Sequence, residues 1–139
     1  MDDCIFCKLV RGEIPCSKVY EDELCFAFLD INPVNNGHTL VIPKKHYETV
    51  LEMPEDEGVA LAKASVKLGK AVKKATDCEG INLLHNIGKA AGQLVFHAHV
   101  HLIPRFEHDT MRLGWDRKKY ESKAQEEEYR RKVETAARN

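Results

Sequence analysis

Polar and apolar residues alternate strictly along residues 97–102, with a histidine at every second position. In a β-strand, residues i, i+2 and i+4 point to the same face, so a strand over residues 95–103 aligns His97, His99 and His101. Neighbouring imidazoles are then about 6.6 Å apart, at a rise of roughly 3.3 Å per residue. The other face carries apolar residues that suit a core: Ala98, Val100 and Leu102. Because aligned imidazoles are costly to bury, we expect them to have a function.

The remaining apolar pattern predicts four further strands and two helices before residue 106. Apolar residues recur at spacings of three and four after Pro54, which is typical of an amphipathic helix over residues 54–76. A short helical turn is expected over residues 4–11, ending at Gly12. Short apolar runs bounded by turn residues predict strands at 19–20, 24–29, 38–42 and 81–84. A chain of 139 residues suffices for one domain, which we expect to span residues 1–139.

Beyond Arg105 the chain becomes polar, and a last helix is predicted over residues 123–137. Ser122 and Gln125 have the spacing of a capping box at its start. Its apolar stripe is weak and consists of Tyr129, Val133, Ala136 and Ala137. Two interpretations are open: the helix packs on the domain, or it is a solvated, charged tail.

The composition is that of an ordinary globular protein, with 43% hydrophobic and 31% charged residues. A net charge of −1 gives no reason to expect binding to nucleic acid or to a membrane surface. The sequence has no apolar run long enough to cross a bilayer and no signal-peptide core. Five cysteines, an odd number, favour reduced thiols over a disulfide framework. We therefore expect a cytoplasmic protein.

Cys4 and Cys7 form a CxxC pair, which is a weak signal by itself. It fits half of a zinc site, a redox pair or two incidental small residues. A tetrahedral zinc site needs two more ligands, and the sequence has no second CxxC motif. His46 and His97 are better candidates than the three isolated cysteines, which are Cys16, Cys25 and Cys78.

Five segments in register resemble the histidine triad (HIT) family, in particular its Hint-like bacterial and archaeal branch. The triad itself is His97-x-His99-x-His101 with apolar residues between and after. The other matching segments are CIFCKLVRGEIP at 4–15, FLDI at 28–31, GHTLVIPKKH at 37–46 and AGQLVFH at 91–97. The resemblance covers roughly residues 4–106 and is weakest over the C-terminal extension, residues 107–139.

The resemblance implies an α+β fold with a five-stranded antiparallel sheet and one main helix. It also implies a homodimer whose two sheets join edge to edge. Members of the family bind purine nucleotides and cleave phosphoramidates, phosphoanhydrides or related phosphate esters. They do so through a nucleotidylated histidine, so the resemblance implies a hydrolase or nucleotidyltransferase without a catalytic metal.

The resemblance also implies a role for individual residues. The middle histidine, His99, corresponds to the nucleophile. His38, His101 and Gln93 complete the implied catalytic set. The implied nucleotide-binding set is Asp30, Ile31, Asn86, Gly92, Gln93, His99 and His101, with Gly88 beside Asn86. The structural zinc ligands of the zinc-bearing members correspond to Cys4, Cys7, His46 and His97.

The sequence departs from the family pattern at Leu94, where many members carry a serine or threonine that assists the leaving group. This departure gives some support to a module that binds without catalysis, and three alternatives in all stay open. A dinucleoside polyphosphate hydrolase would use the same residues on a longer substrate. A metal-dependent hydrolase would hold zinc on the histidine strand to activate water. A purine-nucleotide-binding module would bind without catalysis.

Three residues have competing interpretations. Asp30 is either a ribose ligand or an aspartate that caps a turn. Arg105 is either a phosphate contact or a solvated charge at a strand end. Trp115 is the single tryptophan and suits a pocket wall, a dimer contact or ordinary packing.

Overall fold

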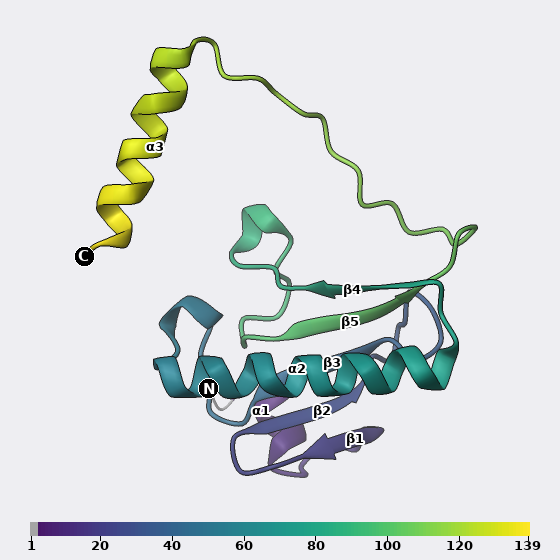
Figure 1. The fold of residues 1–139 in the computed structure, drawn as a ribbon. Coiled ribbons are helices and arrows are strands. Elements are labelled where there is room, and N and C mark those ends of the chain that lie inside the picture. The colour runs from purple at the N-terminus through teal and green to yellow at the C-terminus, as the bar shows by residue number, and fades with distance from the viewer. Residues whose placement is uncertain (1–2) are drawn as a thin grey trace.

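Within residues 3–139, which the computed structural model describes, five strands form one antiparallel sheet in the order β1-β2-β3-β5-β4 (Figure 1). The strands are β1 (Lys18–Glu21), β2 (Cys25–Leu29), β3 (Thr39–Pro43), β4 (Gly80–Leu84) and β5 (Val100–Arg105). The helices are α1 (Ile5–Val10), α2 (Glu55–Thr76) and α3 (Lys123–Ala137), with short 3-10 turns η1 (Val50–Glu52) and η2 (Lys89–Ala91). The predicted α+β fold, with a five-stranded antiparallel sheet and one main helix, is confirmed.

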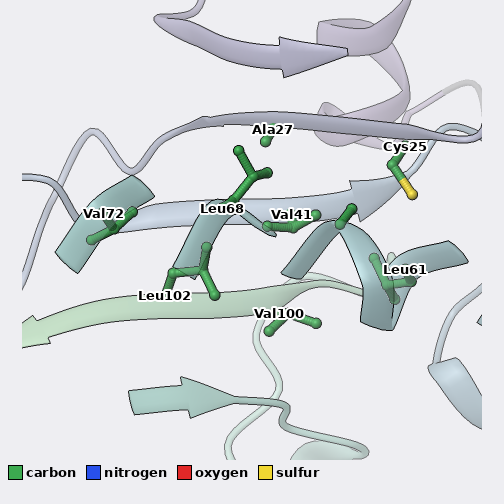
Figure 2. Close-up of a cluster of buried hydrophobic side chains, with 9 residues drawn as sticks. Cys25, Ala27, Val41, Leu61, Leu68, Val72, Val100 and Leu102 are labelled. Carbon is green, nitrogen blue, oxygen red and sulfur yellow. The ribbon is translucent and has the colours of Figure 1, made fainter. Parts of the chain in front are cut away.

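One face of the sheet packs against α2 and forms the main core (Figure 2). The strands contribute Cys25, Ala27, Val41, Val100 and Leu102, and the helix contributes Leu61, Ala64, Leu68 and Val72. Acidic residues fill the first turn of α2, basic residues fill its last turn, and both suit the helix dipole. The helix ends where Asp77 takes a left-handed conformation, with φ of 52°.

The opposite face of the sheet packs against α1. Phe6 and Leu9 of this short helix contact a second apolar cluster on the strands, made of Phe26, Phe28, Leu40 and Ile42. Because side chains alternate along β5, Val100 and Leu102 point to α2 and His101 points to the α1 face. The α1 face is therefore where the histidines gather.

The predicted histidine strand over residues 95–103 is wrong in its boundaries, since β5 begins only at Val100. The neighbouring strand β3 pairs with β5 over three residues and ends at Pro43. Beyond the Val41–Val100 pair the histidine segment has no ladder partner. Instead, Ala98 N–H donates to the Tyr47 carbonyl and His97 Nε2 bonds to the Pro43 carbonyl. His97 and His99 therefore lie on an irregular segment before β5, which one backbone and one side-chain hydrogen bond hold in place. The other predicted elements differ from the observed ones by at most one residue at either end.

The last helix, α3, lies apart from the domain at the end of an extended segment (Figure 1). Ser122 caps it by accepting the Gln125 N–H at 3.1 Å, as the capping box predicts. No α3 residue is buried, so the solvated interpretation describes this single chain better than packing on its own domain. No helix within residues 3–139 is long and apolar enough to span a membrane.

Candidate active site

A cavity of about 520 Å³ opens between α1, β2 and the segment that joins β4 to β5. Its walls are mostly apolar, and one end carries polar side chains: Asp30, Asn32, Asn86, His99 and His101. An apolar slot with a few convergent polar groups is the usual form of a small-molecule site. The volume suits a ligand with a flat apolar part and a charged end.

His99 is held as a neutral imidazole with one nitrogen free. Its Nδ1 lies 2.7 Å from the carbonyl oxygen of His97 and donates to it, since a carbonyl can only accept. Burial lowers the pKa of His99. The proton therefore stays on Nδ1, and Nε2 is the nitrogen that can present a lone pair to the cavity. A neutral imidazole held in this way is a good nucleophile.

His101 has the opposite tautomer to His99, and its hydrogen bond with His38 sets that tautomer. The backbone N–H of Val34 donates to His38 Nδ1 at 3.1 Å, so the His38 proton is on Nε2. That nitrogen lies 3.0 Å from His101 Nδ1, which must accept. The His101 proton is then on Nε2, where it can donate to a ligand. The two cavity histidines therefore differ: one offers a lone pair and the other an N–H.

These histidines resist protonation. Burial, followed by the charges of His99 and His38, lowers the pKa of His101 to about 4. Burial likewise lowers the pKa of His38, and Asp30, whose Oδ2 lies 3.7 Å from His38 Nε2, opposes the shift. The cluster is therefore neutral at pH 7, and it can meet an anionic ligand with hydrogen bonds.

The loop before the histidine segment is held by a buried glutamine. Gln93 accepts the Gly88 N–H at 2.8 Å, and its amide donates to the carbonyls of Glu48 and Val95. Since these bonds use the side chain inside the protein, Gln93 orders the loop. Gly92 takes a positive φ of 94° and lines the cavity beside Asn86.

Four potential metal ligands meet at the edge of this site. The ligand atoms of Cys4, Cys7, His46 and His97 all lie within 4.8 Å of one another. His97 bonds to the Pro43 carbonyl through Nε2, so Nδ1 is unprotonated and lies 3.4 Å from Cys4 Sγ and 3.5 Å from Cys7 Sγ. Zinc with Zn–S of about 2.3 Å and Zn–N of about 2.0–2.1 Å separates tetrahedral S and N ligands by about 3.5 Å. The cluster therefore fits zinc.

The Cys7 thiol of this cluster is a poor nucleophile by itself. Burial raises the pKa of Cys7 to about 11, and the hydrogen bond and charge of Cys4 act in the same direction. A redox or nucleophilic CxxC needs the opposite shift. Of the three interpretations of the motif, a metal site agrees best with this environment.

Comparison with known proteins gives the family. A family model described as the HIT domain matches residues 11–108. The chain belongs to the HIT family. An Arabidopsis thaliana protein named adenylylsulfatase HINT3 is 48% identical over 110 residues, which are 79% of this chain and 56% of that protein. A Schizosaccharomyces pombe protein named adenosine 5'-monophosphoramidase hnt1 is 43% identical over 113 residues, or 81% of this chain and 82% of that protein.

Solved structures of similar proteins share the fold of this HIT chain. A crystal structure of a Streptococcus mutans protein superposes with a TM-score of 0.93 at 42% identity, covering 99% of this chain and 87% of that one. A zinc-bound histidine triad protein from Mycobacterium smegmatis superposes with a TM-score of 0.75 at 34% identity, covering 97% and 98%. Coverage of 99% includes α3, so the extended C-terminal segment of the first structure follows a similar course.

The structure brings most of the predicted HIT site residues together. Around the cavity lie Asp30, Ile31, Asn86, Gly92, His99 and His101, with His38 bonded to His101. Asp30 also caps a turn, because it accepts the Asn32 N–H, so its two interpretations are compatible. Arg105 does not line the cavity, and it pairs with Asp109 instead. Leu94 lines the cavity mouth and is 88% exposed.

Three site features escape sequence reasoning. The Val34 N–H sets the His38 tautomer, and a backbone donor leaves no trace in residue type. The ring of Phe6 stands edge-on to both His97 and His99, at centroid distances of 5.9 and 5.3 Å. His85 is half-buried, and among the described residues its Nε2 is a buried side-chain nitrogen without a hydrogen-bond partner. In the sequence, the only indication that His85 belongs near the site is that it directly precedes Asn86.

The low pKa of His101 predicts how stability depends on pH. Between pH 6.5 and about 4, the unfolded state protonates this residue and the folded state does not, so stability falls as the pH is lowered. We expect His101→Asn to flatten the slope by up to about 1.4 kcal/mol per pH unit. Urea unfolding between pH 7 and pH 4 measures the slope. The variant His108→Asn, at an exposed position, serves as the control. Equal slopes in wild type and His101→Asn would contradict the prediction.

Proposed function

We propose that this HIT chain cleaves a purine nucleoside phosphoramidate, phosphoanhydride or related ester through a covalent nucleotidyl-histidine on His99. One observation carries the proposal: His99 and His101 line one cavity with opposite tautomers. A lone pair and a hydrogen-bond donor side by side suit attack on a phosphate whose oxygens need donors. The A. thaliana and S. pombe relatives are named adenylylsulfatase and adenosine 5'-monophosphoramidase, which supports a phosphate substrate with an adenosine group.

In the proposed reaction, His99 Nε2 forms a bond to phosphorus on one side while the bond to the leaving group breaks on the other. The electron pair of the broken bond stays with the leaving atom, which takes its proton from solvent. His99 Nδ1–H keeps its bond to the His97 carbonyl, which stabilises the positive charge that develops on the ring. His101 Nε2–H donates to the phosphate oxygens. Water then attacks the intermediate, releases the nucleotide and restores His99.

The remaining cavity residues suit nucleotide binding. We propose that the apolar walls take the purine and that Asp30 binds the ribose hydroxyls from the polar end, beside Ile31. Asn86 and Gly92 line the same cavity, and we propose that they bind the phosphate. Gln93 acts on catalysis by ordering the loop. A dinucleoside polyphosphate is an alternative substrate, because the open mouth at Leu94 leaves room for a second nucleoside.

His99→Ala is expected to abolish turnover of adenosine 5'-phosphoramidate and to change nucleotide affinity by no more than about tenfold, because other groups hold the base and phosphate. Steady-state assays and titration calorimetry measure the two effects. Mass spectrometry of the wild type quenched during turnover is expected to show a nucleotidyl group on His99. His108→Ala is the matched control. A His99→Ala protein with substantial turnover would overturn the assignment and favour the metal-dependent or binding-module alternatives.

We also propose that Cys4, Cys7, His46 and His97 hold one structural zinc ion. The matched ligand distances and the zinc-bound M. smegmatis relative support this. With four protein ligands the ion has no open position for water, so it contributes by linking the N-terminal segment to the histidine segment. None of the five cysteines pairs in a disulfide within the described residues, and two of them belong to this cluster, which supports a cytoplasmic location.

The double variant Cys4→Ser/Cys7→Ser is expected to lose the metal and to melt several degrees lower, because the site contributes folding free energy. The folded remainder is still expected to form the His99 adduct. Elemental analysis, thermal melting and mass spectrometry measure the three properties. Cys78→Ser, at a buried position outside the cluster, is expected to keep the metal. Wild-type protein purified without any zinc would contradict the proposal.

Finally, we propose a homodimer. Strand β4 is an edge of the sheet and carries Leu83, which is 48% exposed. Helix α3 exposes Tyr129 and Val133. The superposition on the S. mutans structure supports the observed position of α3 and of the extended segment that leads to it. An exposed strand edge has unpaired backbone groups, and an exposed apolar face is unfavourable in water. A second copy of this chain can bury both.

Sedimentation at micromolar concentration is expected to give about twice the chain mass of 15.8 kDa. Trp115 lies on the extended segment before α3 and is 74% exposed in one chain. If the partner covers it in the dimer, its fluorescence is expected to shift to longer wavelength when dilution separates the two chains. Tyr129→Glu/Val133→Glu is expected to weaken the dimer. The matched control is Lys123→Glu at the exposed start of the same helix. A clean monomer with full activity would disprove the dimer.

A further inference from the structure

The pair of His38 and His101 can hold its protons in two directions. In the observed direction, His38 Nε2–H donates to His101 Nδ1 and His101 Nε2–H faces the cavity. In the reversed direction, His101 Nδ1–H donates to His38 Nε2, and His38 carries its proton on Nδ1. Each ring holds one proton in both cases. The reversed direction would present a lone pair of His101 to the cavity, where it would repel phosphate oxygens.

One backbone group selects between the two directions. The Val34 N–H points at His38 Nδ1 from 3.1 Å and excludes a proton there. The same turn also binds the His38 backbone, since the His38 N–H donates to the Asn35 carbonyl at 3.0 Å. The direction of the pair therefore depends on where the Val34–Asn35 turn sits relative to His38.

The side chain of Asn35 fixes that turn to the strand that carries His101. Its amide donates to the Pro104 carbonyl at 2.8 Å and to Asp109 Oδ2 at 3.0 Å. Pro104 belongs to β5, three residues after His101. One side chain thus holds both ends of the His38–His101 hydrogen bond in register.

Asp109 receives this amide within a larger cluster of donors. Its carboxylate accepts from the Arg105 guanidinium in a bidentate pair, with both distances 2.8 Å, and from the backbone of Phe106 and Met111. The Asp109 side chain is 6% exposed, and Arg105 holds its pKa well below the usual range. Arg105 also donates to Asn82 on β4. The anchor of Asn35 is therefore rigid and fully charged at neutral pH.

We propose that Asn35 and Asp109 are positioning residues that fix the direction of the His38–His101 pair and so keep a hydrogen-bond donor facing the substrate phosphate. Neither residue lines the nucleotide cavity, so both act through His38. The inference rests on the proposed function for the meaning of the donor, but the direction of the pair can be measured without any substrate.

The test compares Asn35→Ala with Asn36→Ala in the full chain. Asn36 is the adjacent asparagine, it is exposed, and its side chain makes no hydrogen bond within the described residues. Long-range proton–nitrogen NMR of protein with isotope-labelled histidine distinguishes protonated from unprotonated ring nitrogens. In Asn35→Ala, the tautomer ratio of His38 and His101 is expected to move toward the reversed form by about 3- to 10-fold, the factor one net hydrogen bond supplies. Asn36→Ala is expected to keep the wild-type spectrum.

A residue that only stabilised the fold would lower the melting temperature and leave the tautomers unchanged, and that result would overturn the inference. Asp109→Asn provides a second variant, since it places an amide N–H where the Asn35 amide now donates; it is expected to shift the same two histidines. Turnover of adenosine 5'-phosphoramidate by Asn35→Ala is expected to fall by about 3- to 10-fold. Shifted tautomers with unchanged turnover would support the positioning role and count against the proposed role of His101.

Discussion

The hydrogen bond between His97 Nε2 and the Pro43 carbonyl is the interaction on which the site depends. It lies where β3 ends, so it takes the place of the backbone ladder that the histidine segment lacks. It also commits one nitrogen of a fully buried ring, which leaves Nδ1 for the cysteines. The carbonyl of the same residue then orients His99. One bond thus connects the sheet, the candidate metal cluster and the candidate nucleophile.

Because side chains alternate along its strands, the sheet carries its main apolar core on one face and the histidines of the candidate site on the other. On β5, the residues that face α2 are purely apolar, and they pack in the main core. The intervening face carries His101 and looks toward α1. The two sets are interleaved along the strand, so the histidine side contributes no side chain to the α2 core. The site can therefore hold several unprotonated imidazoles that would be costly in the middle of a core.

Local patterns predict this fold well because their causes are local. The capping box at Ser122, the acidic start of α2 and the alternation from Val100 onward all appear in the structure. Alternation alone could not show that β5 starts late, because the reason is that its partner strand β3 pairs with it only as far as Val41. The cavity residues, in contrast, are predicted by the family resemblance and by no local pattern.

Long-range partners lie beyond such patterns. Gln93 donates to the carbonyl of Glu48, and Asn35 meets Asp109 across 74 positions of sequence. Nothing in the residue types indicates that one asparagine of the Asn35-Asn36 pair is an anchor while the other is exposed. Arg105 shows the same limit, since its pairing with Asp109 depends on how the chain turns after β5. A side-chain contact is therefore hard to predict from the sequence mainly because its two residues lie far apart along the chain.

The separation of Cys4 from His97 has a consequence for how the protein is made. Their side chains meet across 93 positions of sequence, and His46 joins Cys7 across 39. During synthesis Cys4 and Cys7 leave the ribosome before His46 and His97, so the cluster of four cannot assemble until His97 has followed. Helix α1, with six residues, is too short to persist alone in that interval. The cavity wall that contains Phe6 therefore depends on packing against the strands, and in a nascent chain the two thiols stay without their full set of partners until His97 has been made.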